Sequence, residues 1–191
     1  MIVMTDRRKG HLFIISAPSG AGKGTVIARL LELRPELVFS VSATTRAPRA
    51  SEVDGVSYYF VTRERFSEMI STDEFLEYAE YVGEFYGTPK KPIVDCEESG
   101  KDVLLDIEVQ GARQVKSKDP EAVTIFIIPP DMNELERRLR GRGTDSDEKL
   151  SARLKRAQLE LEERVHYDYI VVNDYVSRAA EEILSIIDSV R

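Results

Sequence analysis

The chain has 191 residues, of which 42% are hydrophobic and 32% are charged, and this composition excludes a disordered or fibrous protein. The length suits one globular domain with an insertion or two. The formal net charge of -7 argues against a broad nucleic-acid surface, because a duplex binder needs a basic face. Any phosphate site must therefore be local.

The only cysteine, Cys96, cannot form an internal disulfide. The N-terminal residues lack the apolar core and cleavage site of a signal peptide, and no stretch approaches ~18 uninterrupted apolar residues. We therefore expect a cytoplasmic protein with a reduced thiol, and neither nucleic acid nor membrane among its partners. The sequence leaves the oligomeric state open.

Short apolar runs rich in Ile, Val and Phe recur along the chain and are typical of buried strands. They occupy residues 12–15, 103–107, 123–128 and 169–172. Segments with the spacing of amphipathic helices lie between or after them. This alternation predicts βαβ units, and hence an α/β fold like that of P-loop NTPases, with a parallel sheet flanked by helices.

Two stretches interrupt the alternation. Residues 40–92 are rich in Tyr, Phe, Val and Thr, which predicts a mixed, partly antiparallel α/β lobe inserted into the core. Residues 141–156 begin with two glycines that end one helix before the next, and we expect a short helical lid there. The core of this single domain then comprises residues 10–39, 93–140 and 157–191.

The stretch SAPSGAGKGT, residues 16–25, lies between the first apolar run and a helical segment, which is the context of a phosphate-binding loop. Glycines let the backbone turn tightly, so that successive N–H groups point at phosphate oxygens while a lysine adds positive charge. The alternative, a Gly-rich turn with a solvated lysine, fits the flanking periodicity less well. The residues expected to hold a nucleotide phosphate are Ser19, Gly20, Ala21, Gly22, Lys23, Gly24 and Thr25.

Gly24 departs from the usual motif, which carries Ser or Thr after the lysine to hold Mg²⁺. Thr25 lies one residue, or about 100° of helix, further round. Because Mg²⁺ usually keeps several waters, we infer that the metal is held mainly by nucleotide phosphates and water, with Thr25 on a phosphate or a bound water and no strong direct protein ligand. The order G-K-G-T is similar to that of adenylate kinases, where it supports catalysis.

Further motifs narrow the assignment: S-x-T-T-R-x-P-R at residues 42–49, Y-G-T at 86–88, L-D-I-E-x-Q-G at 105–111 and G-R-G-T at 141–144. On these motifs the chain resembles a guanylate kinase, a P-loop nucleoside monophosphate kinase, over almost its entire length. The resemblance implies direct, in-line transfer of the γ-phosphate of ATP to GMP, giving ADP and GDP. It also implies Mg²⁺ as the cofactor, with ATP and GMP as the partners.

Arg46 and Arg49 lie three residues apart around Pro48 and can present two guanidinium forks to one phosphate. Two phenols, those of Tyr58 and Tyr86, could donate to the same phosphate. Taken alone, an arginine pair is more often a solvated face, and a tyrosine is more often a core residue. The resemblance implies that all four side chains hold the α-phosphate of GMP.

Guanine offers O6 as an acceptor and N2 as a donor, with N1–H between them, so a carboxylate beside a hydroxyl matches that edge. Glu77 matches the base-reading carboxylate of the family, and Ser42 and Thr88 match its hydroxyls. Adenine would leave Glu77 facing an acceptor nitrogen. Without the family, Glu77 would be read as a surface carboxylate and Thr88, before Pro89, as a helix N-cap.

Asp106 ends an apolar run, at the edge where open α/β sheets bind ligands. It resembles the acidic residue of the family that lies near GMP and the waters of the metal, and Glu108 is a second candidate. Capping of the following helix is the alternative for both carboxylates.

Arg142 and Arg153 match the phosphate-binding arginines of the family. Together with Lys23 they are the expected catalytic residues, because phosphoryl transfer needs cations that neutralise the charge on the γ-oxygens. The resemblance also implies that Arg142 and Asn173 contact ATP, although a turn or cap is an equally natural role for Asn173. The other basic residues of this region are expected to be solvated: Arg137, Arg138, Arg140, Lys155 and Arg156.

Two other functions stay open at this point. One is a guanylate-kinase-like scaffold domain that binds peptides or GMP without catalysis, although such domains typically erode the phosphate loop or the lid, and both look intact here. The other is a kinase for another monophosphate, as the G-K-G-T order suggests. A signalling GTPase is disfavoured, because no N-K-x-D base-reading motif occurs. The use of dGMP, the range of donors and any regulation are not fixed by the sequence.

Overall fold

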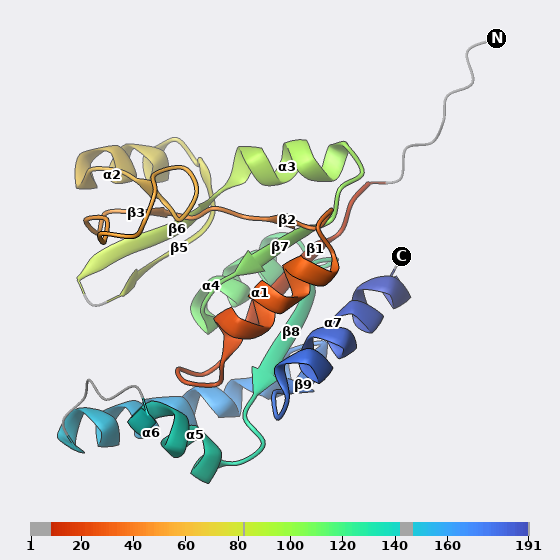
Figure 1. Cartoon of the computed structure of the whole chain (residues 1–191). Coiled ribbons are helices and arrows are strands. Elements are labelled where there is room, and N and C mark those ends of the chain that lie inside the picture. The colour runs from red at the N-terminus through yellow and green to blue at the C-terminus, as the bar shows by residue number, and fades with distance from the viewer. Residues whose placement is uncertain (1–8, 82, 142–146, 191) are drawn as a thin grey trace. The chain divides into compact units, whose positions relative to one another are not determined.

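The computed structural model describes residues 9–81, 83–141 and 147–190, in which strands and helices alternate (Figure 1). The strands are β1 (Leu12–Ser16), β2 (Val38–Phe39), β3 (Ala43–Thr44), β4 (Tyr59–Phe60), β5 (Phe75–Tyr81), β6 (Glu84–Pro89), β7 (Val103–Asp106), β8 (Val123–Ile128) and β9 (Tyr169–Val172). The helices are α1 (Lys23–Leu33), α2 (Arg63–Ser71), α3 (Lys90–Glu98), α4 (Val109–Lys118), α5 (Met132–Gly141), α6 (Asp147–Glu162), the short 3-10 helix η1 (Glu163–His166) and α7 (Val176–Val190).

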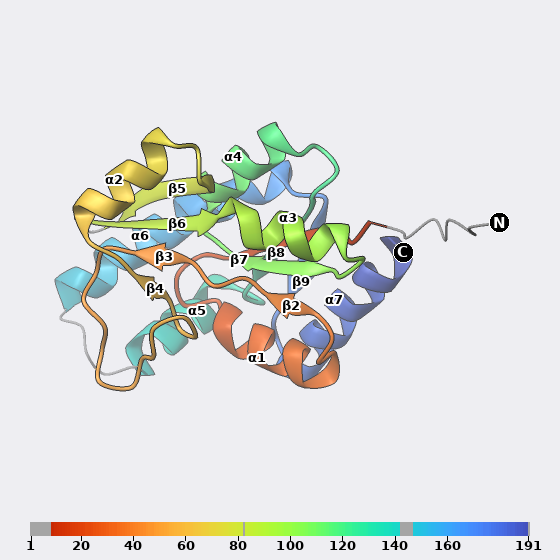
Figure 2. The same cartoon turned by 90° about the horizontal axis from the view of Figure 1, so that it is seen from above.

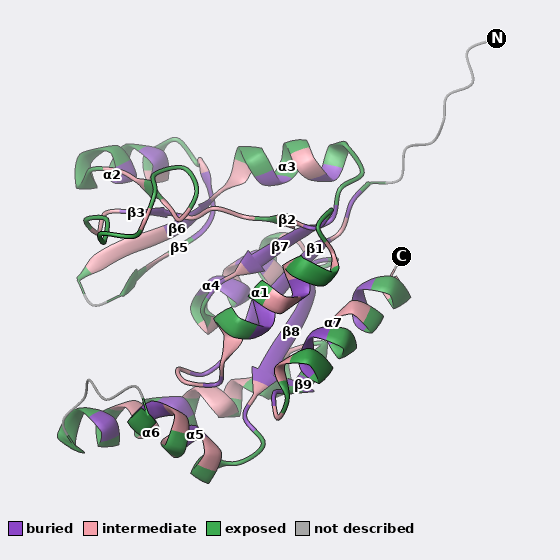
Figure 3. Cartoon of the chain, viewed as in Figure 1, coloured by how far each residue is buried: buried purple, intermediate pink, exposed green. Residues whose placement is uncertain are grey.

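The apolar runs of the sequence form a parallel sheet. Over the described residues this sheet has five strands in the order β2-β7-β1-β8-β9. β2 is parallel to β7, and β1 and β9 are each parallel to β8. All residues of β1 are buried, and most of those of β7 and β8 (Figure 3), which is why these strands read as continuous apolar runs. The predicted α/β fold with a parallel sheet and flanking helices is confirmed.

The chain divides into two compact units, each described by itself. Within the described residues, unit 1 covers 9–12, 37–105 and 110–122, and unit 2 covers 13–36, 106–109 and 123–190. The lobe expected at residues 40–92 falls within unit 1, and the described part of the expected lid falls within unit 2. That the chain forms a single domain stays a prediction.

Unit 1 contains the mixed sheet that the sequence predicted. Its strand order is β4-β3-β6-β5, with β3 parallel to β4 and antiparallel to β6, and with β5 antiparallel to β6. The core of this lobe is aromatic: the ring centroids of Phe66 and Phe75 lie 4.4 Å apart, and those of Phe66 and Phe85 lie 5.5 Å apart. Ala43 and Met69 complete the buried cluster, which joins α2 to the sheet.

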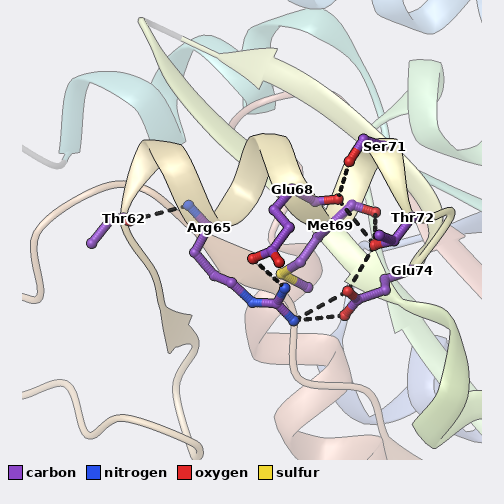
Figure 4. Close-up of polar contacts among 7 residues, drawn as sticks. All are labelled: Thr62, Arg65, Glu68, Met69, Ser71, Thr72 and Glu74. Atoms are coloured by element: carbon purple, nitrogen blue, oxygen red, sulfur yellow. Dashed lines mark hydrogen bonds and ion pairs between the residues drawn. The ribbon is translucent and has the colours of Figure 1, made fainter.

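Side-chain contacts at both ends of α2 lead into β5 (Figure 4). Thr62 caps the helix by accepting the N–H of Arg65 at 3.1 Å. The Arg65 guanidinium then binds Glu68 and Glu74, each at 2.8 Å, and the Thr72 hydroxyl donates to Glu74 at 2.8 Å. These groups are largely exposed, so they stabilise the lobe modestly, but they order the turn that precedes β5.

In unit 2, β1 leads through the phosphate loop into α1, and α1 and α7 lie side by side in both views (Figures 1 and 2). α5 and α6 share a small apolar cluster formed by Leu135, Leu139, Leu150 and Ala157. None of the helices in the described residues combines the length and the apolar character needed to cross a membrane.

Candidate active site

The loop between β1 and α1 has the backbone of a phosphate-binding loop. Gly20 and Gly22 have φ values of 92° and 90°, in the left-handed region that favours glycine. A Cβ at Gly22 would lie 2.5 Å from Nδ2 of Asn173, and one at Gly20 would lie 2.7 Å from Cδ2 of Leu139. Both glycines are therefore required by conformation and by space, and α1 begins at Lys23.

Lys23 is a cation held between carboxylates. Its Nζ lies 2.7 Å from Oδ1 of Asp106 and 3.8 Å from Oε1 of Glu108, and it donates to the carbonyl of Ile107 at 3.4 Å. Burial acts to lower the pKa of Lys23, but the neighbouring carboxylates, Asp106 first and then Glu108 and Glu160, raise it above its usual value. The ammonium group is therefore charged, and Asp106 lies next to it at the end of β7.

Helix α6 holds Ser19 of the loop through two contacts. Oε2 of Glu160 accepts the N–H of Ser19 at 3.1 Å, and the Arg153 guanidinium donates to Oγ of Ser19 at 3.0 Å. Glu160 is fixed in turn by Nε of Arg156 at 2.7 Å. The expected catalytic residue Arg153 thus lies at the phosphate loop, whereas Arg142 lies outside the described residues.

Asn173 and Arg138 contact the same loop. Nδ2 of Asn173 donates to the carbonyl of Ala21 at 2.7 Å. Arg138 donates to that carbonyl at 3.0 Å and to the Asn173 carbonyl at 2.8 Å. The expectation that Arg138 is solvated is wrong, because its guanidinium binds these two carbonyls and Glu134 of its own helix. Over the described residues, Oδ1 of Asn173 is buried without a hydrogen-bond partner.

The exposed basic residues of α5 behave as predicted. Arg137 and Arg140 have side chains that are 75% and 56% exposed, and each pairs with a glutamate on the same helix. Pairs at this spacing are worth a few tenths of a kcal/mol. This pairing is that of an ordinary exposed helix surface.

Around Gly24 the structure is open. Apart from its chain neighbours and the backbone of its own helix, no described atom lies within 4 Å of the position that a Cβ on Gly24 would take, and Gly24 and Thr25 are both exposed. Among the described residues, no group of three or more His, Cys, Asp or Glu side chains is arranged to hold a metal ion. That the metal has no strong direct protein ligand, and that Thr25 and Asp106 reach it by way of water, both stay predictions.

In unit 1, the guanidinium of Arg46 is bound by Glu52. The two groups form a bidentate pair with N–O distances of 2.9 and 2.8 Å, and Glu52 also accepts the N–H of Arg49 at 2.7 Å. The hydrogen bond from Arg46 and then that from Arg49 lower the pKa of Glu52 to about 2. Arg46 also lies 5.4 Å from the ring centroid of Tyr58, whose ring is 6.0 Å from that of Tyr86. Arg46, Tyr58 and Tyr86 are thus brought together.

The other phosphate-binding candidate of this lobe is less fixed. Arg49 is exposed, and its backbone rather than its guanidinium makes the contact with Glu52. A bidentate fork on a phosphate therefore needs this side chain to order when the phosphate binds, which stays a prediction.

The buried pair Glu77 and Thr88 is the second feature of unit 1. Glu77 is 5% exposed and lies opposite Thr88 in the β5–β6 register, and the Thr88 hydroxyl donates to its Oε1 at 2.6 Å. Glu77 is not a surface carboxylate. The N-cap alternative for Thr88 is wrong as well, because Pro89 is the N-cap residue of α3 and no side chain caps that helix.

Ser42 lies directly before β3, on the far side of β6 from β5. Its carbonyl accepts the N–H of Tyr59 at 2.9 Å, which joins it to β4. The contact of its hydroxyl with a base stays a prediction.

Sequence reasoning missed several residues that shape these two regions. Glu52 could have been found from its spacing to Arg46 and Arg49 in an irregular, charged stretch. Glu160 follows Arg156 by four residues, which is the spacing of a helical ion pair, but nothing in the pattern links it to Ser19. Long-range contacts of this kind have no local signal.

Known proteins resemble this chain in sequence and in fold. A family model described as "Guanylate kinase" matches residues 9–190. The chain is 50% identical over 179 residues to the guanylate kinase of Synechocystis sp., covering 94% of each protein. It is 52% identical over 183 residues to a guanylate kinase of Thermus thermophilus, covering 96% of this chain and 83% of the relative. A solved guanylate kinase from Anaplasma phagocytophilum has a TM-score of 0.79 at 38% identity, covering 95% of this chain and 86% of that one.

Proposed function

This chain belongs to the guanylate kinase family, and from that premise we propose that it transfers the γ-phosphate of ATP to GMP, giving ADP and GDP. The membership confirms the resemblance inferred from the sequence and the enzyme class, a nucleoside monophosphate kinase. The strongest support is that one chain contains both a glycine-rich loop that ends in the charged Lys23 and a buried carboxylate, Glu77, that accepts a hydrogen bond from Thr88.

The donor nucleotide is bound by the loop of unit 2. The N–H groups of Ala21 and Thr25 bind backbone carbonyls, so the other N–H groups of residues 19–25 are those that face its phosphates, that of Ser19 after leaving Glu160. Lys23 leaves Asp106 and Glu108 to neutralise the phosphate oxygens. Arg153, which contacts the loop, and Arg142 neutralise the transferring phosphoryl group. Asn173, which donates to the carbonyl of Ala21 in the loop, is the proposed contact of the adenine base.

The acceptor nucleotide is bound by unit 1. Arg46, Arg49, Tyr58 and Tyr86 hold the phosphate of GMP, while the ionised Glu77 accepts N1–H and N2–H of guanine. Ser42 and Thr88 supply the neighbouring hydroxyls, and Asp106 is a further proposed contact of GMP. No general base is required, because the attacking atom is a phosphate oxygen that is already ionised.

Mg²⁺ is the expected cofactor, and when bound it neutralises charge on the β- and γ-phosphates. The side chains of the loop fit an ion held chiefly by phosphates and water: position 24 offers no hydroxyl, and Thr25 and Asp106 are the groups that reach its waters. A cytoplasmic location, with neither membrane nor nucleic acid as a partner, completes the proposal and is supported by the single half-buried thiol of Cys96.

A panel of nucleoside monophosphates tests the proposal. The full-length chain is incubated with ATP, Mg²⁺ and each of GMP, dGMP, AMP, CMP and UMP, and ADP formation is followed by a coupled assay. GMP should be the preferred acceptor. Turnover of another monophosphate in preference to GMP would show that GMP is not the preferred acceptor. Binding of GMP without any turnover would favour the scaffold function.

A further inference from the structure

Helix α4 binds the backbone of β5 on both sides of Glu77. The amide Nε2 of Gln114 donates to the carbonyl of Tyr78 at 2.8 Å, and its Oε1 accepts the N–H of Tyr78 at 3.3 Å. Nζ of Lys118 donates to the carbonyl of Leu76 at 2.7 Å. Figure 2 shows α4 beside β5. The residues immediately before and after the base-reading carboxylate are therefore attached to one helix.

The strand needs this support, because its ladder is irregular at this point. Phe75 pairs with Pro89 and Glu77 with Thr88, so the register skips Leu76. Such a bulge re-aims the following side chain and leaves the extra residue outside the ladder. Lys118 binds the carbonyl of that extra residue, and the direction of the Glu77 side chain thus depends on α4 as well as on β6.

Gly111, in the first turn of the same helix, leaves room for the carboxylate. A Cβ on Gly111 would lie 3.0 Å from Cδ of Glu77 and closer still to Oε2, and the three atoms nearest to it all belong to Glu77. Glycine is unfavourable inside a helix, but here the absence of a Cβ leaves free the space that the Glu77 carboxylate needs. Any side chain at this position would push the carboxylate away from its present place.

Charge acts in the same direction as geometry. Burial raises the pKa of Glu77, while the hydrogen bonds from Thr88 and the positive charge of Lys118 lower it. Only the ionised carboxylate accepts both N1–H and N2–H of guanine. Lys118 therefore favours the protonation state that guanine binding requires.

We propose that Gly111, Gln114 and Lys118 are positioning residues that hold the Glu77 carboxylate in place and thereby set the preference for guanine. The inference rests on the proposed function, in which Glu77 reads the base. These three residues act through Glu77 and its strand, so their removal should change the affinity for the base and leave ATP binding unchanged.

The test compares Gly111→Ala, Gln114→Ala and Lys118→Met with wild type. Lys116→Met is the matched control, because Lys116 lies on the same helix and donates to a backbone carbonyl outside β5, that of Ala122, at 2.8 Å. Calorimetry gives the Kd of GMP and of IMP, which lacks only the 2-amino group. Steady-state kinetics give kcat and the KM of GMP and of ATP, and circular dichroism gives Tm.

We expect Gly111→Ala to raise the Kd of GMP by about tenfold or more, and the other two variants to raise it by about two- to tenfold. The Kd of IMP should rise less, so that the preference for GMP over IMP falls, while the KM of ATP stays unchanged. Equal losses for GMP and IMP would overturn the proposal, as would a loss in Lys116→Met as large as in Lys118→Met. Gln114→Ala and Lys118→Met decide the matter if Gly111→Ala does not fold.

A double-mutant cycle with Glu77→Ala isolates the route of action. Without the carboxylate, Gly111→Ala should cause no further loss of GMP affinity, and a loss of the same size in both backgrounds would overturn the inference. Wild type that binds GMP without turning it over would refute the proposed function and leave the calorimetric comparison decisive. Wild type that does not bind GMP would overturn both.

Discussion

Substitution of Glu77 by Gln should weaken GMP use and strengthen the fold. In the proposed complex the carboxylate accepts two hydrogen bonds, from N1–H and N2–H. A Gln can accept at Oε1 only, the atom that also receives the Thr88 hydroxyl, because its other terminal atom is an NH₂ donor. Hydrogen bonds to a charged group contribute ~1.5–3 kcal/mol each. The loss of one such bond corresponds to about 10- to 10²-fold in kcat/KM for GMP, while the value for AMP should change little.

The effect on stability has the opposite sign. Burial raises the folded-state pKa of Glu77 above its usual 4.5, so the folded chain holds this proton more tightly than the unfolded chain does. Ionisation of Glu77 therefore opposes folding at pH values above the raised pKa, and this penalty disappears as the pH falls toward 4.5 and below. Glu77→Gln should raise Tm at neutral pH and lose that advantage in acid.

Two measurements check this reasoning: kcat/KM for GMP and AMP at pH 7.5, and thermal melts followed by circular dichroism between pH 4 and pH 8. GMP affinity of wild type should also fall as the pH drops through the raised pKa. An unchanged preference for GMP over AMP would remove Glu77 from base recognition. A Tm difference that does not vary with pH would refute the assignment of a buried, ionised carboxylate.

Three further substitutions test the remaining contacts. Lys23→Met should lower kcat by about 10²- to 10³-fold, because it removes a cation from the phosphates, with folding checked by circular dichroism; near-normal turnover would contradict its role. Arg153→Met should lower kcat by ~10³-fold or more with little change in the KM of GMP. Lys155→Met, at an exposed position nearby, is the control and should leave kcat unchanged. A change confined to KM in Arg153→Met would count against a role in the transition state. Glu52→Gln should lower Tm at pH 7 and not at pH 2. The pKa of Glu52 is lowered from 4.5 to about 2, so its pairing with Arg46 stabilises the fold above pH 4.5, and this stabilisation is lost as the pH falls toward 2. A variant that melts at the same temperature as wild type at both pH values would show that the pair contributes nothing.

The parallel core could be predicted because its chemistry is local. β1 and β8 are buried along most of their length, so their sequences are unbroken apolar runs. The glycines of the loop between β1 and α1 indicate a backbone conformation that other residues rarely adopt. The mixed lobe was predictable from its aromatic and β-branched residues. In each case the signal lies within a few consecutive residues.

The side-chain partners were less predictable, because they depend on tertiary structure. Thr88 before Pro89 has the local pattern of a helix start, yet the strand pairing turns its hydroxyl to Glu77. In the charged run of α5, the pattern cannot tell that Arg138 folds back on the loop while Arg137 stays in solvent. Both depend on contacts with residues far away in the chain.

The pairing of Lys23 with Asp106 and of Arg46 with Glu52 changes how phosphate affinity should be understood. Each incoming phosphate replaces a carboxylate, so binding is an exchange of one anion for another, and its free energy is the difference between two ion pairs. An anion that pairs more weakly than a carboxylate should therefore not displace it, and non-specific binding of anions is reduced. The exchange also favours product release, because Asp106 and Glu52 can pair again with Lys23 and Arg46 when the phosphates dissociate.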